Sequence, residues 1–143
     1  MSDTPATPSA NRYRFRAWHK TEAIMIYDIQ SLAFIGKDLT GVVFRYNINA
    51  IKTGQNDAKY GFSVDEVVVM QSTGLLDRNG VDMYEGDIVR GKETGVVEWF
   101  PQDGAWGVRV DSEAWSYLFT CNLPEKHEVI GNIYENPDLL PKP

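Results

Sequence analysis

The sequence predicts a mainly β protein, with a small SH3-like, partly open β-barrel in the C-terminal half and a smaller N-terminal part that is β or α+β. Two patterns predict this fold class. Short apolar runs recur roughly every eight to twelve residues, separated by turns rich in Gly, Asp and Asn, and no long amphipathic helix is evident. The chain has 143 residues, of which 43% are hydrophobic and 24% charged, as in an ordinary soluble domain.

Changes in composition predict three segments. Residues 1–11 are small and polar and have nothing to bury, so they are expected to form a disordered tail. Residues 12–65 form the predicted N-terminal subdomain, and residues 66–143 form the predicted barrel.

The first strand is expected where cations alternate with aromatic or small residues, from Arg12 to Trp18. This period of two places Arg12, Arg14 and Arg16 on one wet face and the side chains between them toward the core. The apolar residues 23–27 then return as the second strand of a hairpin.

Residues 31–61 are harder to interpret. Within them, residues 41–48 resemble a strand, and residues 52–59 have the composition of a loop.

The β pattern becomes dense after residue 65. The Asn79-Gly80 step predicts a tight hairpin turn because both residues tolerate positive φ. Residues 85–87 form a second predicted turn, and a closing helical turn is expected at residues 136–140. Further strands are expected at residues 88–90, 96–100, 105–110, 117–121 and 128–134.

The charge balance is acidic, with 14 Lys and Arg against 20 Asp and Glu and a net charge of −6. This argues against broad affinity for nucleic acid or anionic membranes, but leaves room for a local basic patch. The single cysteine, Cys121, cannot close an internal disulfide, which fits a reducing cytosol. Neither a membrane span nor a signal peptide is evident, so we expect a cytoplasmic protein with no membrane partner.

Catalytic groups are weakly represented. His19 and His127 lie in polar contexts, where a solvated surface imidazole is the ordinary outcome. Cys121 lies in an apolar context that favours a buried, inert thiol. The sequence motifs of phosphate-binding loops, nucleophile elbows and zinc proteases do not occur. The sequence therefore indicates no catalytic residue, metal or cofactor.

Four carboxylates, Asp77, Asp82, Glu85 and Asp87, fall within one turn-rich stretch. Such a cluster could hold a divalent metal, but it lacks the ligand spacing of a calcium loop. The more ordinary interpretation is that Asp77 and Asp87 accept backbone hydrogen bonds in their turns.

Binding chemistry is better represented. The N-terminal arginines lie near several rings and could meet phosphates or stack on bases, although a solvated strand face is the commoner reason for such a pattern. The C-terminal aromatic residues are expected to be mostly core, with one or two left over for an exposed groove. They are Trp99, Phe100, Trp106, Trp115, Tyr117 and Phe119. The candidate binding residues are Arg12, Arg14, Arg16, Trp18, Trp106 and Trp115.

Four blocks of the sequence, in order, resemble the YopX family of phage and prophage proteins. They are RFRAW at residues 14–18, MQSTGLLDRNG at 70–80, MYEGDIV at 83–89 and EVIGNIYENPDLL at 128–140. The resemblance implies a mainly β protein with a small C-terminal barrel, acting inside the infected bacterial cell. It carries over no catalytic residues, and the blocks themselves consist of turn formers and core residues.

We expect a phage or prophage accessory protein that is a non-catalytic binding module for a host or phage macromolecule, most simply a protein. The acidic charge suits a basic partner. One alternative is a nucleic-acid-binding barrel that uses the Arg12, Arg14 and Arg16 face. A less expected one is a small-ligand or metal-dependent enzyme at the turns of residues 77–87. Exposed strand edges also make a homo-oligomer plausible.

Overall fold

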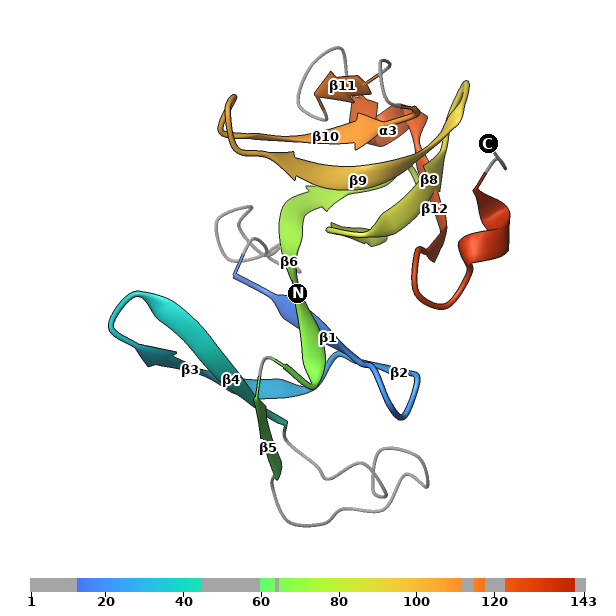
Figure 1. Ribbon diagram of the computed structural model, residues 1–143. Coiled ribbons are helices and arrows are strands. Elements are labelled where there is room, and N and C mark those ends of the chain that lie inside the picture. Colours follow the sequence, from blue (N-terminus) through green and yellow to red (C-terminus); the bar gives the residue numbers. More distant parts are fainter. Residues whose placement is uncertain (1–12, 45–59, 64, 112–114, 118–122, 141–143) are drawn as a thin grey trace, which may run out of the picture. The chain divides into compact units, whose positions relative to one another are not determined.

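The computed structural model describes residues 13–44, 60–63, 65–111, 115–117 and 123–140 (Figure 1). The chain divides into two compact units, one of residues Phe15–Met70 and one of Met1–Arg14 with Gln71–Pro143. The sequence placed this boundary after residue 65 rather than after Met70. The predicted tail, residues 1–11, and the predicted loop, residues 52–59, lie outside the described residues.

The fold class is mainly β, as predicted. The described strands are β1 (Phe15–His19), β2 (Ile24–Ile26), β3 (Ile29–Ile35), β4 (Asp38–Phe44), β5 (Tyr60–Ser63), β6 (Val67–Leu76), β7 (Asp82–Tyr84), β8 (Asp87–Arg90), β9 (Thr94–Phe100), β10 (Ala105–Arg109), β11 (Trp115–Tyr117) and β12 (Glu128–Asn132). Helical structure among the described residues is confined to α3 (Leu123–Lys126) and the 3-10 turn η1 (Pro137–Leu139), the latter within the predicted closing turn. These helices are far too short to cross a membrane.

The unit of residues Phe15–Met70 is built from antiparallel pairs. β1 pairs with β2, which confirms the predicted hairpin, and β4 lies between β3 and β5 in a three-stranded sheet. The predicted strand at residues 41–48 coincides with β4 up to Phe44. The core of this unit consists of Ala17, Ile26, Val42, Phe44 and Val67.

The other unit contains a five-stranded antiparallel sheet in the order β11-β10-β9-β8-β12. This sheet curls into a partly open half-barrel (Figure 1), as predicted. Val89, Val97 and Val108 of this sheet pack with Met83 of β7 in the core of the unit.

The Asn79-Gly80 turn is confirmed, and Asp77 organises it. Gly80 has a φ of 80°, and the Asn79 and Val81 N–H groups donate to Asp77 Oδ1 at N···O distances of 2.8 and 2.9 Å. The other carboxylate oxygen, Oδ2, accepts the N–H of Val129 in β12 at 2.8 Å. One buried carboxylate therefore stabilises a local turn and joins it to a strand distant in sequence.

The predicted turn at residues 85–87 is also confirmed. Gly86 has a φ of 85°, a conformation that side chains disfavour. Its N–H donates to the Val97 carbonyl at 2.9 Å, and its carbonyl accepts the Ile133 N–H at 3.0 Å. Asp87 Oδ2 accepts the Tyr84 N–H at 2.7 Å, as the sequence predicted for a turn-capping acid.

Arg16 does not lie on a wet face, contrary to expectation. It is only 2% exposed, and the strand that carries it, β1, lies between β2 and β6 in its sheet. The Arg16 Cζ atom lies 6.0 Å from the ring centroid of Tyr27. A long aliphatic stem and an aromatic neighbour allow an arginine to be buried where strand periodicity predicts exposure.

The two histidines are buried, not solvated as expected. His19 is 6% exposed, and its Nδ1 accepts the N–H of Glu22 at 3.1 Å, which stabilises the turn after β1. His127 is 9% exposed and packs on Gly91, where an added Cβ would lie 3.1 Å from the imidazole Cδ2. Both imidazole rings are therefore buried. Their polar neighbours in the sequence did not predict this burial.

Candidate functional site

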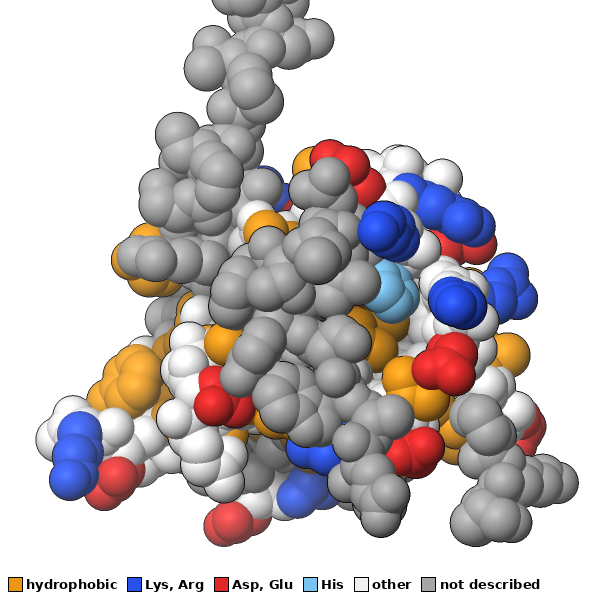
Figure 2. All heavy atoms as spheres, turned by 90° about the horizontal axis from the view of Figure 1, so that it is seen from above, with side chains coloured by type: hydrophobic (Ala, Val, Ile, Leu, Met, Phe, Trp, Pro, Cys, Tyr) orange, Lys and Arg blue, Asp and Glu red, His pale blue; other side chains and the backbone are white. Residues whose placement is uncertain are grey.

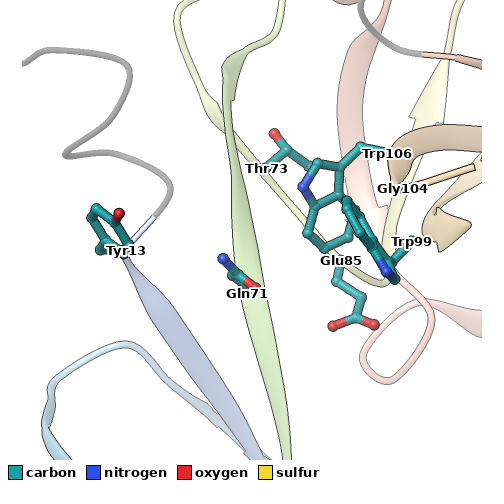
Figure 3. A pocket seen from close by; sticks show the side chains of 7 residues that line it. All are labelled: Tyr13, Gln71, Thr73, Glu85, Trp99, Gly104 and Trp106. Carbon is teal, nitrogen blue, oxygen red and sulfur yellow. The ribbon is translucent and has the colours of Figure 1, made fainter. Parts of the chain in front are cut away.

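An open pocket of about 600 Å³ lies within the barrel-containing unit (Figure 3). Its volume falls in the range typical of ligand sites. The lining residues are Tyr13, Gln71, Thr73, Glu85, Trp99, Gly104 and Trp106. They come from the segment before β1, from β6, from the turn after β7 and from the β9–β10 hairpin.

The β9–β10 hairpin brings the two tryptophans together. Trp99 in β9 is the direct partner of Trp106 in β10, so both indoles project from the same face of the sheet. The next pair on that face, Val97 and Val108, is buried in the core. The two tryptophans therefore lie on the same face of the sheet as the core pair Val97 and Val108, one step closer to the β9–β10 turn.

The two indoles meet edge to face. Their ring centroids are 5.1 Å apart and their planes lie at 66° to each other. Trp99 is 44% exposed, whereas Trp106 is partly buried and packs against the core. The pair forms a pre-organised apolar corner, because T-shaped packing holds the rings in a favoured geometry.

Polar groups form the other side of the pocket. The N–H of Glu85 donates to the Gln71 carbonyl at 3.0 Å, which fixes the turn beside β6. The hydroxyl of Thr73 accepts the Leu75 N–H at 3.0 Å, so it serves the backbone of its own strand. In Figure 3 the Glu85 carboxylate lies beneath the indole rings and the Gln71 amide lies beside them.

The described lining of the pocket contains one charged side chain. Glu85 is the one carboxylate among its lining residues, and neither Lys nor Arg belongs to that described set. The whole chain carries a net charge of −6. The described lining therefore combines an exposed aromatic wall with one acid.

The comparison with known families decides the identity of the fold. The sequence model described as YopX protein matches residues 14–141, nearly the whole chain. The chain belongs to the YopX family.

Two solved structures share the YopX fold of this chain. One is the crystal structure of protein EF1440 from Enterococcus faecalis, with a TM-score of 0.63 and 24% identity, covering 90% of this chain and 97% of that one. The other is the crystal structure of protein YopX from Bacillus subtilis, with a TM-score of 0.59 and 21% identity, covering 92% of this chain and 98% of that one. At such identities the likeness concerns the fold. No curated protein matches the chain significantly.

The predicted candidate residues that the structure describes have different surroundings. Trp106 lines the pocket, whereas Trp18 lies half-buried in β1. Arg14 forms an ion pair with Asp82, and Arg16 is buried. Arg12 lies outside the described residues, as does the side chain of Trp115.

The outcome for the remaining predicted aromatic and thiol groups is mixed. Phe100 is buried in the core, as predicted, and is 6% exposed. Cys121, Phe119 and the side chain of Tyr117 lie outside the part of the chain that the structure describes.

The four carboxylates after residue 76 separate into different roles. Asp77 and Asp87 accept backbone N–H groups, Asp82 pairs with Arg14, and Glu85 lines the pocket. Within the described residues, no group of three or more His, Cys, Asp or Glu side chains could hold a metal ion. Two of the four, Asp77 and Asp87, therefore stabilise turns.

The sequence predicted that one or two aromatic rings form an exposed groove and named Trp106, but it did not single out Trp99 and placed Glu85 among possible metal ligands. The clue was the spacing of the hairpin. A turn centred on residues 101–104 makes Trp99 and Trp106 direct cross-strand partners, and such partners share a face.

Charged side chains of both signs occur on the face shown in Figure 2, where basic side chains gather near a histidine. Among the described residues, Arg78 and Arg90 share one acid, Glu128. Arg78 Nη2 lies 2.7 Å from Glu128 Oε2, and Arg90 Nη2 lies 3.5 Å from the same oxygen. Both arginines form ion pairs with Glu128. The negative charge of Glu128 weakens the attraction of these arginines for phosphate groups.

Proposed function

We propose that this YopX-family chain is a phage or prophage accessory protein that acts in the host cytoplasm as a non-catalytic binding module. Its partner is a host or phage macromolecule, most simply a protein. The observation that carries the proposal is the pocket walled by Trp99 and Trp106, with one indole 44% exposed.

Exposure of Trp99 supports binding rather than a purely structural role. Exposed aromatic surface is unfavourable in water, and tryptophan is among the residues that contribute most binding energy at protein interfaces. The indole is held against Trp106 in a fixed geometry, so little conformational entropy is lost when a partner covers it.

The pocket does not resemble a catalytic centre. Its single carboxylate, Glu85, has no histidine, cysteine or second acid beside it among the described lining residues. General acid–base or nucleophilic catalysis requires such neighbouring groups. Recognition of a partner group needs only the aromatic wall, the acid and the amide of Gln71.

The test is affinity purification of the tagged full chain from host cells, with nuclease treatment and mass spectrometry of the retained proteins. Three forms are compared: the unaltered chain, Trp99→Ala, and Phe34→Ala as the control. Phe34 is 57% exposed but belongs to the other unit, so its loss removes a comparable apolar surface away from the pocket.

We expect a nuclease-resistant partner that is retained by the Phe34→Ala variant and lost from the Trp99→Ala variant. Equal recovery with all three forms, or retention of this chain alone, would refute the pocket as a protein-binding site. Retention of this chain alone would instead indicate self-association.

Nucleic-acid binding through Arg12, Arg14 and Arg16 has less support. Arg16 is 2% exposed and Arg14 is paired with Asp82, so neither presents the free cationic face that phosphate binding begins with. In the same experiment, capture that disappears on nuclease treatment would favour this alternative.

A further inference from the structure

We propose that the Trp99–Trp106 pocket binds an extended, proline-containing segment, and that in the free protein this segment is the chain's own residues 5–8, Pro-Ala-Thr-Pro. The inference rests on the proposed binding function for its choice of pocket, and a protein partner would compete with the chain's own segment for that pocket. It is supported by the place where the described chain begins, by the pattern of residues 4–10 and by the geometry of the two indoles.

The described chain begins at the pocket. Tyr13 is the first described residue and lines the pocket, in the same unit as the indoles. Figure 3 shows Tyr13 on one side and the indoles on the other, with Gln71 between them. Pro8 precedes Tyr13 by five positions. Five extended residues span about 16 Å, about twice the edge of a cube with the pocket's volume of about 600 Å³. The segment is therefore long enough to reach across the pocket.

Residues 4–10 have the pattern of a polyproline II ligand. They read Thr-Pro-Ala-Thr-Pro-Ser-Ala, with Pro5 and Pro8 three positions apart. Because a polyproline II helix has three residues per turn, the two rings lie on one edge, about 9 Å apart. Proline fixes φ, so little conformational entropy is lost when such a segment binds. By itself the segment has nothing to bury, whereas an aromatic pocket gives its prolines a surface to pack against.

The two indoles suit a proline ring. Their planes lie at 66° and their centroids are 5.1 Å apart, so a pyrrolidine ring placed in the corner between them can contact both. Aromatic-lined grooves recognise proline-containing segments through such contacts. Trp99 is 44% exposed, and covering it removes apolar surface from water. Each indole N–H is a donor, and the carbonyl groups of a polyproline II segment are acceptors without internal hydrogen bonds.

The segment is electrically neutral where it would dock. Residues 4–10 contain no ionisable side chain, so their binding does not depend on the charge of Glu85 or on the amide of Gln71. The stabilisation comes from apolar contacts with the indoles and from the short connection to Tyr13. A short tether gives an effective concentration in the millimolar range, so a contact too weak to hold a separate peptide suffices within one chain.

The test uses the full chain labelled with ¹⁵N and follows the indole N–H resonances of Trp99 and Trp106. The unaltered chain is compared with a double-proline variant that carries Pro5→Ala and Pro8→Ala. Both substitutions lie outside the two cores, so the rest of the spectrum reports whether the fold is unchanged.

The matched control carries Ser2→Ala and Ser9→Ala, which alter the same part of the chain and leave both prolines in place. A separate peptide with the sequence of residues 4–10 is titrated into each form. A second peptide, with alanine in place of both prolines, tests whether the response requires proline.

We expect both indole resonances to differ between the double-proline variant and the unaltered chain, and to coincide between the serine control and the unaltered chain. The proline peptide should move the resonances of the double-proline variant toward those of the unaltered chain. It should bind this variant about threefold more tightly than the unaltered chain, because the chain's own segment no longer competes. The alanine peptide should cause no shift, and Trp99→Ala should abolish the response to the proline peptide.

Coincident indole resonances in the unaltered chain and the double-proline variant, equal affinity of the proline peptide for these two forms, or an equal response to the alanine peptide would each overturn the inference. Failure of the proposed function is read separately, from partner capture. Stronger capture by the double-proline variant than by the unaltered chain would support both. Indole shifts without a captured partner would support docking of residues 5–8 and reject the binding module. Equal capture by the two forms, with coincident resonances, would retain the module and reject the docking.

Discussion

At the scale of single residues, buried acids in this chain act on the backbone. Asp77 is 5% exposed and accepts hydrogen bonds from the N–H groups of Asn79, Val81 and Val129. Backbone donors in a protein interior must be paired, because an unsatisfied buried N–H costs about 1–3 kcal/mol. Asp77 thus holds a turn and a distant strand together without contributing to a chemical site.

We predict that Asp77→Ala lowers the free energy of unfolding by about 3 kcal/mol, because three backbone donors lose their acceptor. Asp77→Asn should lose about half as much, since its side-chain oxygen can still accept the two N–H groups of the turn. Urea denaturation measures both. The exposed acid Asp103 provides the control, and Asp103→Ala should change stability by less than about 0.5 kcal/mol. Equal stabilities for Asp77→Ala and this control would contradict the assigned role.

At the scale of elements, the β9–β10 hairpin carries different chemistry on its two faces. One face continues from the core pair Val97 and Val108 to the exposed aromatic pair. The other holds Arg109 against Phe100 and Glu98. A strand period of two separates these sets, so the hairpin can present a recognition surface and remain anchored.

We predict that the two tryptophans differ in their effect on stability. Trp106→Ala should cost about 3 kcal/mol because the ring packs on the core, whereas Trp99→Ala should cost less than about 1.5 kcal/mol because the ring is 44% exposed. Thermal and urea denaturation of both variants measure this difference. A larger loss in Trp99→Ala would mean that this residue is chiefly structural, and its use as a binding probe would fail.

At the scale of the whole molecule, the two units have separate cores. One core is centred on Phe44 and Val42, and the other on Val97 and Val89, with no residue in common. The pocket is lined by residues of the barrel-containing unit alone. Each unit therefore has its own source of hydrophobic stabilisation.

We predict that Phe44→Ala, which empties a fully buried position, lowers stability by about 3–5 kcal/mol and acts mainly on its own unit. Native-state hydrogen exchange should show faster exchange in β1–β4, with protection in β8–β10 largely retained. Val97→Ala should give the converse pattern. Uniform loss of protection throughout the chain in either variant would show that the units unfold together.

Local features were accessible from the sequence, and long-range ones were not. The β class, the turns at Asn79-Gly80 and Gly86, and the capping roles of Asp77 and Asp87 depend on backbone preferences of a few neighbouring residues, so the sequence by itself determined them. Burial of Arg16, burial of both histidines and the pairing of Trp99 with Trp106 beside Glu85 were decided by the tertiary structure alone. The physical reason is that burial and proximity depend on which strands pair and what covers them, and periodicity within one strand does not specify its neighbours.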